Sequence, residues 1–147
     1  MDFRHGALGL AMLLATSCGV TADGPPEIVV DRTACSHCGM LISEPIYAAA
    51  YDAGGGEKRV FDDLACLRNA APAERQGLRV WVHDAASGAW IDGAQAVFVS
   101  SPAIRTPMGG GILAYRHPQD AEGAAAKHKA QVIPLLSTVL DKQESGS

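Results

Sequence analysis

Short hydrophobic runs separated by glycine-rich or polar turns recur along the chain, and they predict strands joined as hairpins. The first pair of runs, 46–51 and 58–61, flanks the glycine triplet at 54–56. The second pair, 80–82 and 90–91, flanks the turn-forming segment 84–88. Further apolar runs predict strands at the following positions: 28–30, 96–99, 111–115 and 131–133.

Helix signals follow the strand pairs. Asp62 is placed to cap a helix of about two turns through Ala71, which Pro72 would end. Pro118 can open a second helix through Lys129, and 134–143 is a third candidate. On the first helix, side chains three and four residues apart share a face, and Cys66 projects beside it.

The order of hairpin then helix occurs twice, which indicates an α+β fold instead of alternating βαβ units. We therefore expect two small ββαβ-like units that form one compact mature region. The first would be a Cys-rich ββα unit over 28–77. The second would be an α+β unit over 78–147 with a Thr-Pro-Met-Gly motif and C-terminal helices. Trp81 and Trp90 should face each other across the second hairpin, and His83 should lie on the polar surface.

The N-terminal region has the pattern of an export signal. Residues 7–15 form an apolar core that is too short to span a membrane, which needs about 20 residues. Small residues lead to Cys18, so we expect a cleaved signal peptide over 1–17 and a lipidated Cys18 followed by a flexible tether over 18–27. The alternative is an ordinary cleaved signal in which Cys18 has no special role. The expected location is the periplasmic face of a bacterial membrane, the outer membrane if the cysteine is lipidated.

Composition narrows the functional classes further. The net charge of −4 and the lack of basic clusters make nucleic acid an unsuitable partner. If Cys18 is lipidated, three cysteines remain, and an odd number in an oxidising compartment leaves one thiol free, reactive or metal-bound.

Sulfur chemistry is concentrated in two glycine-flanked runs. Positions 35–40 read Cys-Ser-His-Cys-Gly-Met, and Met108 lies in Thr-Pro-Met-Gly-Gly-Gly. Thiolate and thioether ligands together suit a soft monovalent metal such as Cu(I), whereas zinc has little use for methionine. Gly39 permits the tight backbone path that converging ligands need.

Four motifs in this order resemble the NosL family of copper-binding accessory lipoproteins associated with nitrous oxide reductase. The motifs are Cys35-x-x-Cys38-Gly39-Met40, Phe61-Asp62-Asp63-Leu64-x-Cys66-Leu67, Trp90-Ile91-Asp92 and Thr106-Pro107-Met108-Gly109-x-Gly111. The resemblance implies a small α+β fold, a periplasmic lipid-anchored protein and delivery of Cu(I) to a copper enzyme or its assembly machinery. It also implies Cys38, Met40 and Met108 as copper ligands.

The remaining candidates have open roles. Cys38 could instead form a disulfide with Cys35 or Cys66, and Cys35 would be a second thiolate or half of that disulfide. Cys66 would be a ligand or an inert buried thiol, and His37 a ligand or an exposed loop residue. Asp62 and Asp63 fit a helix cap better than a metal site.

Two other functions compete with a non-enzymatic copper chaperone. A thioredoxin-like thiol-disulfide oxidoreductase would use Cys35 and Cys38, but that fold needs a long helix starting at the motif, which Gly39 and Pro45 would interrupt. A structural zinc knuckle would use the three cysteines and a histidine. Metal identity separates the three hypotheses.

Overall fold

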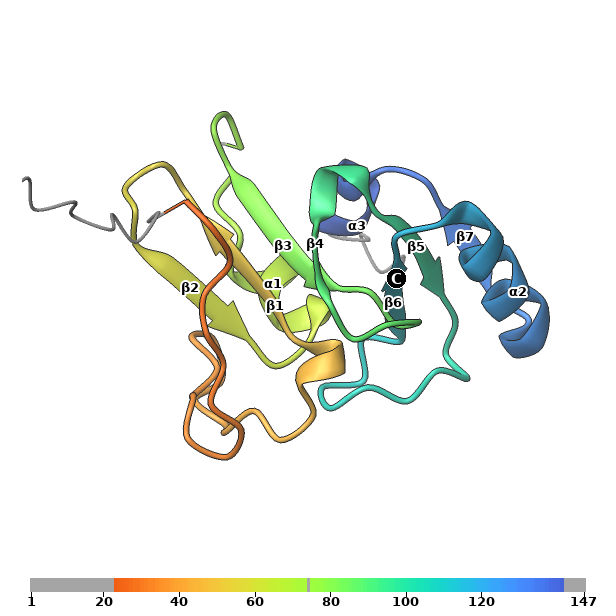
Figure 1. Ribbon diagram of the computed structural model, residues 1–147, viewed down its shortest axis with the longest axis horizontal. Coiled ribbons are helices and arrows are strands. Elements are labelled where there is room, and N and C mark those ends of the chain that lie inside the picture. Colours follow the sequence, from red (N-terminus) through yellow and green to blue (C-terminus); the bar gives the residue numbers. More distant parts are fainter. Residues whose placement is uncertain (1–22, 74, 142–147) are drawn as a thin grey trace, which may run out of the picture.

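The computed structural model describes residues 23–73 and 75–141, which form an α+β fold with two small antiparallel sheets (Figure 1). The predicted fold class is confirmed. In chain order the elements are the 3-10 helix η1 (Pro45–Tyr47), β1 (Ala49–Asp52), β2 (Lys58–Phe61), α1 (Leu64–Ala70), β3 (Arg79–His83), β4 (Trp90–Asp92), the 3-10 helix η2 (Gly93–Gln95), β5 (Val97–Ser100), β6 (Ile112–Tyr115), α2 (Pro118–His128), β7 (Gln131–Ile133) and α3 (Leu136–Leu140).

The larger sheet has the strand order β2-β1-β3-β4, and all neighbours are antiparallel. Its first hairpin turns at the predicted glycines. Asp52 Oδ1 accepts hydrogen bonds from the N–H groups of Gly54 at 2.8 Å and Gly56 at 3.1 Å. Both glycines have a positive φ, 96° and 75°, which residues with a side chain rarely adopt.

The predicted second hairpin, β3 and β4, joins this same sheet. Ala50 of β1 lies between Val60 of β2 and Trp81 of β3. The sheet therefore includes strands from both sides of residue 78, where the sequence suggested that a second unit begins. Side chains from both segments share one core as a result.

The smaller sheet has the order β6-β5-β7, again antiparallel, and α2 packs against it. A small core of Val99, Ile104, Tyr115 and Ala121 fills the space beneath the helix. The main core crosses from one sheet to the other, because Phe61 of β2 and Phe98 of β5 both belong to it and are fully buried.

Asp84 joins the two sheets. It forms a parallel bridge with Ala114 of β6, and its buried carboxylate accepts from Ser87 Oγ at 2.6 Å and from Arg116 N at 3.2 Å. Burial acts to raise the pKa of Asp84, but hydrogen bonds from Ser87, Arg116 and Ala86 outweigh it, so the pKa lies below its ordinary value.

The predicted strand at 28–30 is wrong. Val29 O accepts from the N–H groups of Arg32 and Thr33, and Thr33 Oγ1 accepts from Val29 N at 2.9 Å. This local turn, with Asp31 at a φ of 59°, satisfies the backbone without a partner strand. Val29 and Val30 consequently remain exposed.

The predicted helices occur with shifted ends. Asp63, and not Asp62, is the N-cap of α1, which still ends before Pro72. A side chain at the cap must lie in extended backbone, and Asp63 has φ −151° and ψ 175°. The last helix, α3, spans only Leu136–Leu140, shorter than the predicted 134–143.

The predicted facing of Trp81 and Trp90 is also wrong. The register of the hairpin pairs Trp81 with Asp92 and His83 with Trp90. The His83 ring lies 3.8 Å from the Trp90 ring between centroids, and its Nδ1 lies 3.0 Å from Ala48 O. His83 is therefore buried instead of lying on the polar surface, and that burial lowers its pKa.

The expected signal peptide and the expected lipidation site at Cys18 lie outside the described residues. Within residues 23–73 and 75–141, no helix combines the length and apolar composition needed to cross a bilayer.

We expect Asp84→Asn to lower the free energy of unfolding by about 2 kcal/mol at pH 7, because an amide cannot accept from every donor around the carboxylate. The pKa of Asp84 is lowered by folding, so its contribution is present above the ordinary carboxyl pKa of about 3.9. That contribution disappears as the pH falls through the folded-state value.

Urea unfolding at pH 7 and pH 2 measures the effect. The difference between wild type and variant should shrink at pH 2. Glu122→Gln on the exposed side of α2 is the control and should change little at either pH. An equal loss at both pH values would show that the charge of Asp84 is irrelevant.

Candidate metal centre

The segment 33–42, here called the knuckle, is a tight turn that brings Cys35 and Cys38 together. Its ends pair through a bridge between Ala34 and Leu41, and Cys35 N donates to Met40 O at 2.8 Å. Gly39 N donates back to Cys35 O at 2.9 Å, and Gly39 has a φ of +76°. This left-handed conformation is the reason the sequence needs glycine directly after Cys38.

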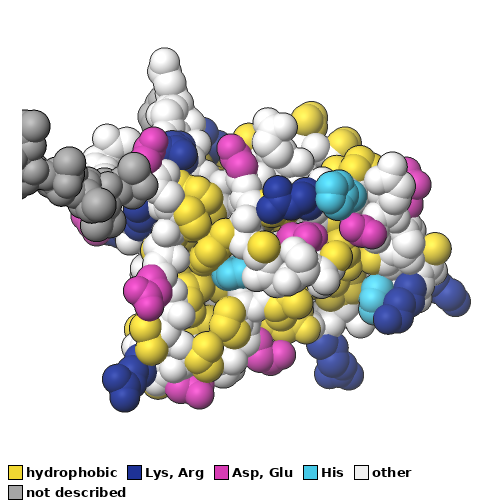
Figure 2. Space-filling model, in the orientation of Figure 1, with side chains coloured by type: hydrophobic (Ala, Val, Ile, Leu, Met, Phe, Trp, Pro, Cys, Tyr) yellow, Lys and Arg dark blue, Asp and Glu magenta, His cyan; other side chains and the backbone are white. Residues whose placement is uncertain are grey.

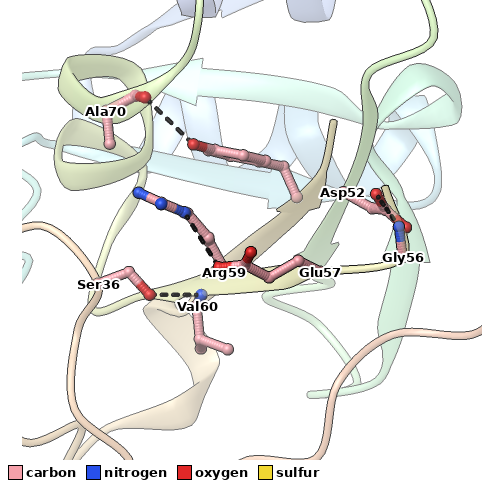
Figure 3. A network of polar contacts seen from close by, with 8 residues as sticks. Ser36, Asp52, Gly56, Glu57, Arg59, Val60 and Ala70 are labelled. Atoms are coloured by element: carbon pink, nitrogen blue, oxygen red, sulfur yellow. Dashed lines mark hydrogen bonds and ion pairs between the residues drawn. The ribbon is translucent and has the colours of Figure 1, made fainter. Parts of the chain in front are cut away.

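The knuckle is fixed to the outer edge of β2 through Ser36. Ser36 N donates to Val60 O at 2.7 Å, and Val60 N donates to Ser36 Oγ at 3.1 Å (Figure 3). Ser36 therefore pairs both backbone groups of Val60, one through its own N–H and the other through its hydroxyl. The contact determines where the two cysteines of the knuckle lie relative to the sheet.

Cys66 supplies a third thiol from the first turn of α1. The sulfur atoms of Cys35, Cys38 and Cys66 all lie within 4.8 Å of one another, and each residue is a free thiol. Cys35 and Cys66 are buried, at 3% and 2% exposed, whereas Cys38 is only partly buried. We name this group the three-thiol cluster.

The surroundings shift the pKa values of Cys35 and Cys66 in opposite directions. Burial acts to raise the pKa of Cys35, but hydrogen bonds from the backbone of Cys38, Asp62 and His37 lower it below its ordinary value. Burial, followed by the contacts with Cys35 and Cys38, raises the pKa of Cys66. The pKa of Cys35 is therefore shifted downward and that of Cys66 upward.

The loop that carries Met108 folds back onto the start of α1. Asp63 Oδ1 caps the helix by accepting from Ala65 N at 2.8 Å and Cys66 N at 3.1 Å. Its second oxygen, Oδ2, accepts from Thr106 Oγ1 at 2.8 Å and Met108 N at 3.0 Å. One buried carboxylate thus connects the backbone of Cys66 with the backbone of Met108.

The close approach of this loop depends on glycine. A Cβ added to Gly110 would lie 2.8 Å from the Cβ of Ala65, and one added to Gly111 would lie 2.5 Å from Ser101 O. A larger residue at position 110 would push the loop away from α1, and one at position 111 would push it away from Ser101 at the end of β5. The glycines of the Thr-Pro-Met-Gly-Gly-Gly run are therefore packing requirements as well as turn residues.

The methionine side chains are accessible. Met40 is 55% exposed and Met108 is 39% exposed. For Met108 this agrees with the expectation that the turn presents the side chain instead of burying it. His37 is exposed on the knuckle and does not belong to the three-thiol cluster.

Two acidic residues have contacts or surroundings that the sequence did not reveal. Asp63 was expected to be at most a cap, and its second oxygen holds the Met108 loop, a link that only a contact between distant segments could show. Asp62 is buried, and its Oδ1 has no hydrogen-bond partner among the described residues. Burial first, and then the charges of Asp63 and Glu44, raise the pKa of Asp62.

Fold and site together define a class: small α+β proteins with a mostly buried cluster of thiols and with exposed methionines on the adjoining turn and on the loop bound to α1. The comparisons with known proteins make this specific. The family model described as NosL matches residues 26–137, most of the chain, so the chain belongs to the NosL family. The resemblance inferred from the four motifs is confirmed.

A solved structure has the same fold. It is the crystal structure of the copper chaperone NosL from Shewanella denitrificans, with a TM-score of 0.61 and 20% sequence identity. The match covers 74% of this chain and 90% of that chain. No curated protein matches the sequence significantly.

We expect Asp63→Asn to release the Met108 loop while keeping α1. The new amide retains one oxygen for the helix cap, but its NH2 group faces the N–H groups of Met108 and Gly110. The free energy of unfolding should fall by about 1–3 kcal/mol. Hydrogen exchange at Met108 and Gly110 should accelerate more than exchange in β1.

Thr106→Val is the matched control, because it removes one bond to the same oxygen and the acceptor of Gly111 N–H but keeps the donation of Met108 N and Gly110 N to Asp63. Its effect on exchange should be smaller. Unchanged protection of Met108 N–H in Asp63→Asn would mean that the carboxylate does not hold the loop.

Proposed function

We propose that this protein is a periplasmic Cu(I) chaperone that holds the ion with Cys35, Cys38, Met40 and Met108. The observation that carries the proposal is the three-thiol cluster on the knuckle and α1, with exposed thioethers in the knuckle and on the loop bound to α1. Thiolate and thioether ligands select Cu(I) over harder ions. The fold shared with a copper chaperone supports the same assignment.

Charge limits how many thiolates can bind the ion. Cu(I) with two thiolates carries a net charge of −1, and with three it carries −2. The groups that affect Cys35 and Cys66 are backbone N–H groups and other thiols, with no cation among them, and the two residues that precede α1 are the acidic Asp62 and Asp63. A second uncompensated negative charge in this buried place would cost several kcal/mol.

Neutral thioethers complete the coordination without adding charge. In this proposal Cys35 and Cys38 supply the thiolates, and the deeply buried Cys66 stays outside the ligand set. Met40 and Met108 then close the exposed side. With these four ligands, Cys66 and His37 stay outside the main ligand set that we propose.

The mixture of buried and exposed ligands suits transfer. A receiving protein would first replace the exposed thioethers, then the partly buried Cys38, and finally the buried Cys35. Hydrophobic side chains gather on the lower left of Figure 2, the side on which the knuckle lies. Leu41 of the knuckle and Ile46 of η1 are exposed hydrophobic residues. Such a surface can exclude water while the ligands exchange.

The proposed client is a copper enzyme or its assembly machinery, nitrous oxide reductase in the first place, because the motifs resemble accessory proteins of that enzyme. A client with its own thiolate, thioether or imidazole ligands would accept the ion without releasing it. A non-enzymatic role agrees with membership of the NosL family and with the copper chaperone that shares the fold.

The two alternatives fit the geometry less well. In a thioredoxin-like oxidoreductase the Cys-x-x-Cys pair would begin a long helix, whereas here it lies in a turn followed by η1. For zinc, the described residues offer three thiols without a histidine in the cluster. Metal analysis of protein purified under anaerobic conditions separates these possibilities: about one copper per chain supports the proposal, and zinc or a metal-free disulfide contradicts it.

Met108→Leu should weaken Cu(I) binding at least tenfold, or about 1.4 kcal/mol, while the metal-free protein melts at nearly the same temperature. Leucine keeps the approximate volume and apolarity but offers no ligand. Cys38→Ser, which replaces a thiolate with a hydroxyl, should abolish tight binding. Competition with a Cu(I) chelator measures affinity, and melting of the metal-free protein measures stability.

The exposed Val132→Leu is the control for a surface change away from the knuckle and should leave both properties unchanged. Normal copper affinity together with a lowered melting temperature in Met108→Leu would assign Met108 to packing.

The proposed lipid anchor makes a separate prediction. Cys18→Ala should move the mature protein from the membrane fraction to the soluble fraction and remove incorporation of labelled fatty acid. Cys66→Ala, which leaves Cys18 intact, is the control and should stay with the membrane. A variant without Cys18 that still carries label would place the anchor elsewhere.

A further inference from the structure

The three-thiol cluster contains more sulfur than the proposed copper site uses. Two thiolates with Met40 and Met108 already supply four ligands, yet Cys66 places a third sulfur within 4.8 Å of both other thiols. Cys66 is 2% exposed, and N–H donation to the Asp63 cap fixes its backbone. Three thiols around one point are therefore a feature of the folded protein.

Charge determines which ion would use all three sulfurs. A monovalent ion with three thiolates carries −2 and a divalent ion carries −1, whereas a trivalent ion is neutral. The cluster is mostly buried and lies next to Asp62, whose unpaired Oδ1 is itself buried. A neutral complex avoids the cost of burying charge in such a place.

The cluster also has a geometry suited to a pyramidal ion. Trivalent arsenic forms three bonds on one side and keeps a lone pair on the other. Cys35 and Cys66 form the buried side of the cluster, and the partly exposed Cys38 lies on the side open to solvent. All three sulfur atoms already lie within 4.8 Å of one another, so the third bond joins atoms that the fold has brought close together.

We infer that Cys35, Cys38 and Cys66 together form a binding site for trivalent arsenic, supplied as arsenite. The reaction is an exchange without change of oxidation state. Each of three S–H groups replaces one hydroxyl of As(OH)3, three As–S bonds form, three As–O bonds break, and three water molecules leave. Thioethers cannot form these bonds, so Met40 and Met108 take no part.

One consequence concerns copper. Arsenic that binds all three sulfurs removes Cys35 and Cys38 from the proposed copper site, so arsenite should prevent copper loading. The inference depends on the three-thiol cluster and stands whether or not copper is the natural cargo.

The test uses native mass spectrometry of reduced, metal-free protein with sodium arsenite under anaerobic conditions. The expected adduct has the mass of one arsenic atom less three protons, and alkylation should then find all three cysteines protected. Cys66→Ser should weaken arsenite binding at least tenfold. Met108→Leu, the matched control, should bind arsenite as the wild type does.

Phenylarsine oxide, which needs only two thiols, checks that Cys66→Ser still folds with Cys35 and Cys38 together. It should bind the variant and the wild type alike. An adduct that loses only two protons in the wild type, full arsenite affinity in Cys66→Ser, or simultaneous binding of copper and arsenite would overturn the inference. Arsenite binding that fails while copper binds normally leaves the copper proposal intact, and the reverse result leaves this inference intact.

Discussion

Both oxygens of the Asp63 carboxylate are saturated by hydrogen bonds, and the two sets of donors come from distant parts of the chain. Oδ1 caps α1, and Oδ2 binds a loop 43 to 47 residues further along. A buried carboxylate is tolerated only when its charge is matched by donors, and here the N-terminus of a helix supplies part of them. Cys66 N donates to one oxygen of Asp63, and Met108 N donates to the other. The start of the helix and the position of the loop therefore depend on the same carboxylate.

The sulfur-containing side chains of this region differ in solvent exposure. Buried thiols lie toward the helix, a partly buried thiol lies in the turn, and thioethers lie at the surface. All of these side chains offer a soft sulfur atom, but they differ in solvent exposure and in the charge that they can carry. The buried end favours neutral or singly charged complexes, and the exposed end permits exchange. If the proposed copper site is right, affinity and release depend on different residues of one site.

The sequence predicted what depends on neighbours in the chain. The hairpin at Gly54–Gly56, the end of α1 before Pro72 and the tight turn at Gly39 are all local, and all occur. It could not reveal that β3 and β4 join the first sheet, since pairing between distant strands has no local signature. Cys66 remained undecided for the same reason: its entry into the cluster depends on the knuckle docking against β2. The structure brings the three thiols together, and the assignment of metal ligands remains a prediction.

Ser36 lies between the two cysteines of the knuckle and forms hydrogen bonds with the N–H and C=O groups of Val60. Val60 belongs to β2, which is an edge strand of the larger sheet. An open edge offers unpaired donors and acceptors to other chains, and proteins suppress this route to aggregation by covering such strands. The knuckle, which carries two of the thiols, thus also protects this edge strand from pairing with strands of other chains. A change that loosens the knuckle would reduce solubility as well as metal binding, so the spacing between the cysteines is constrained by the sheet as much as by sulfur chemistry.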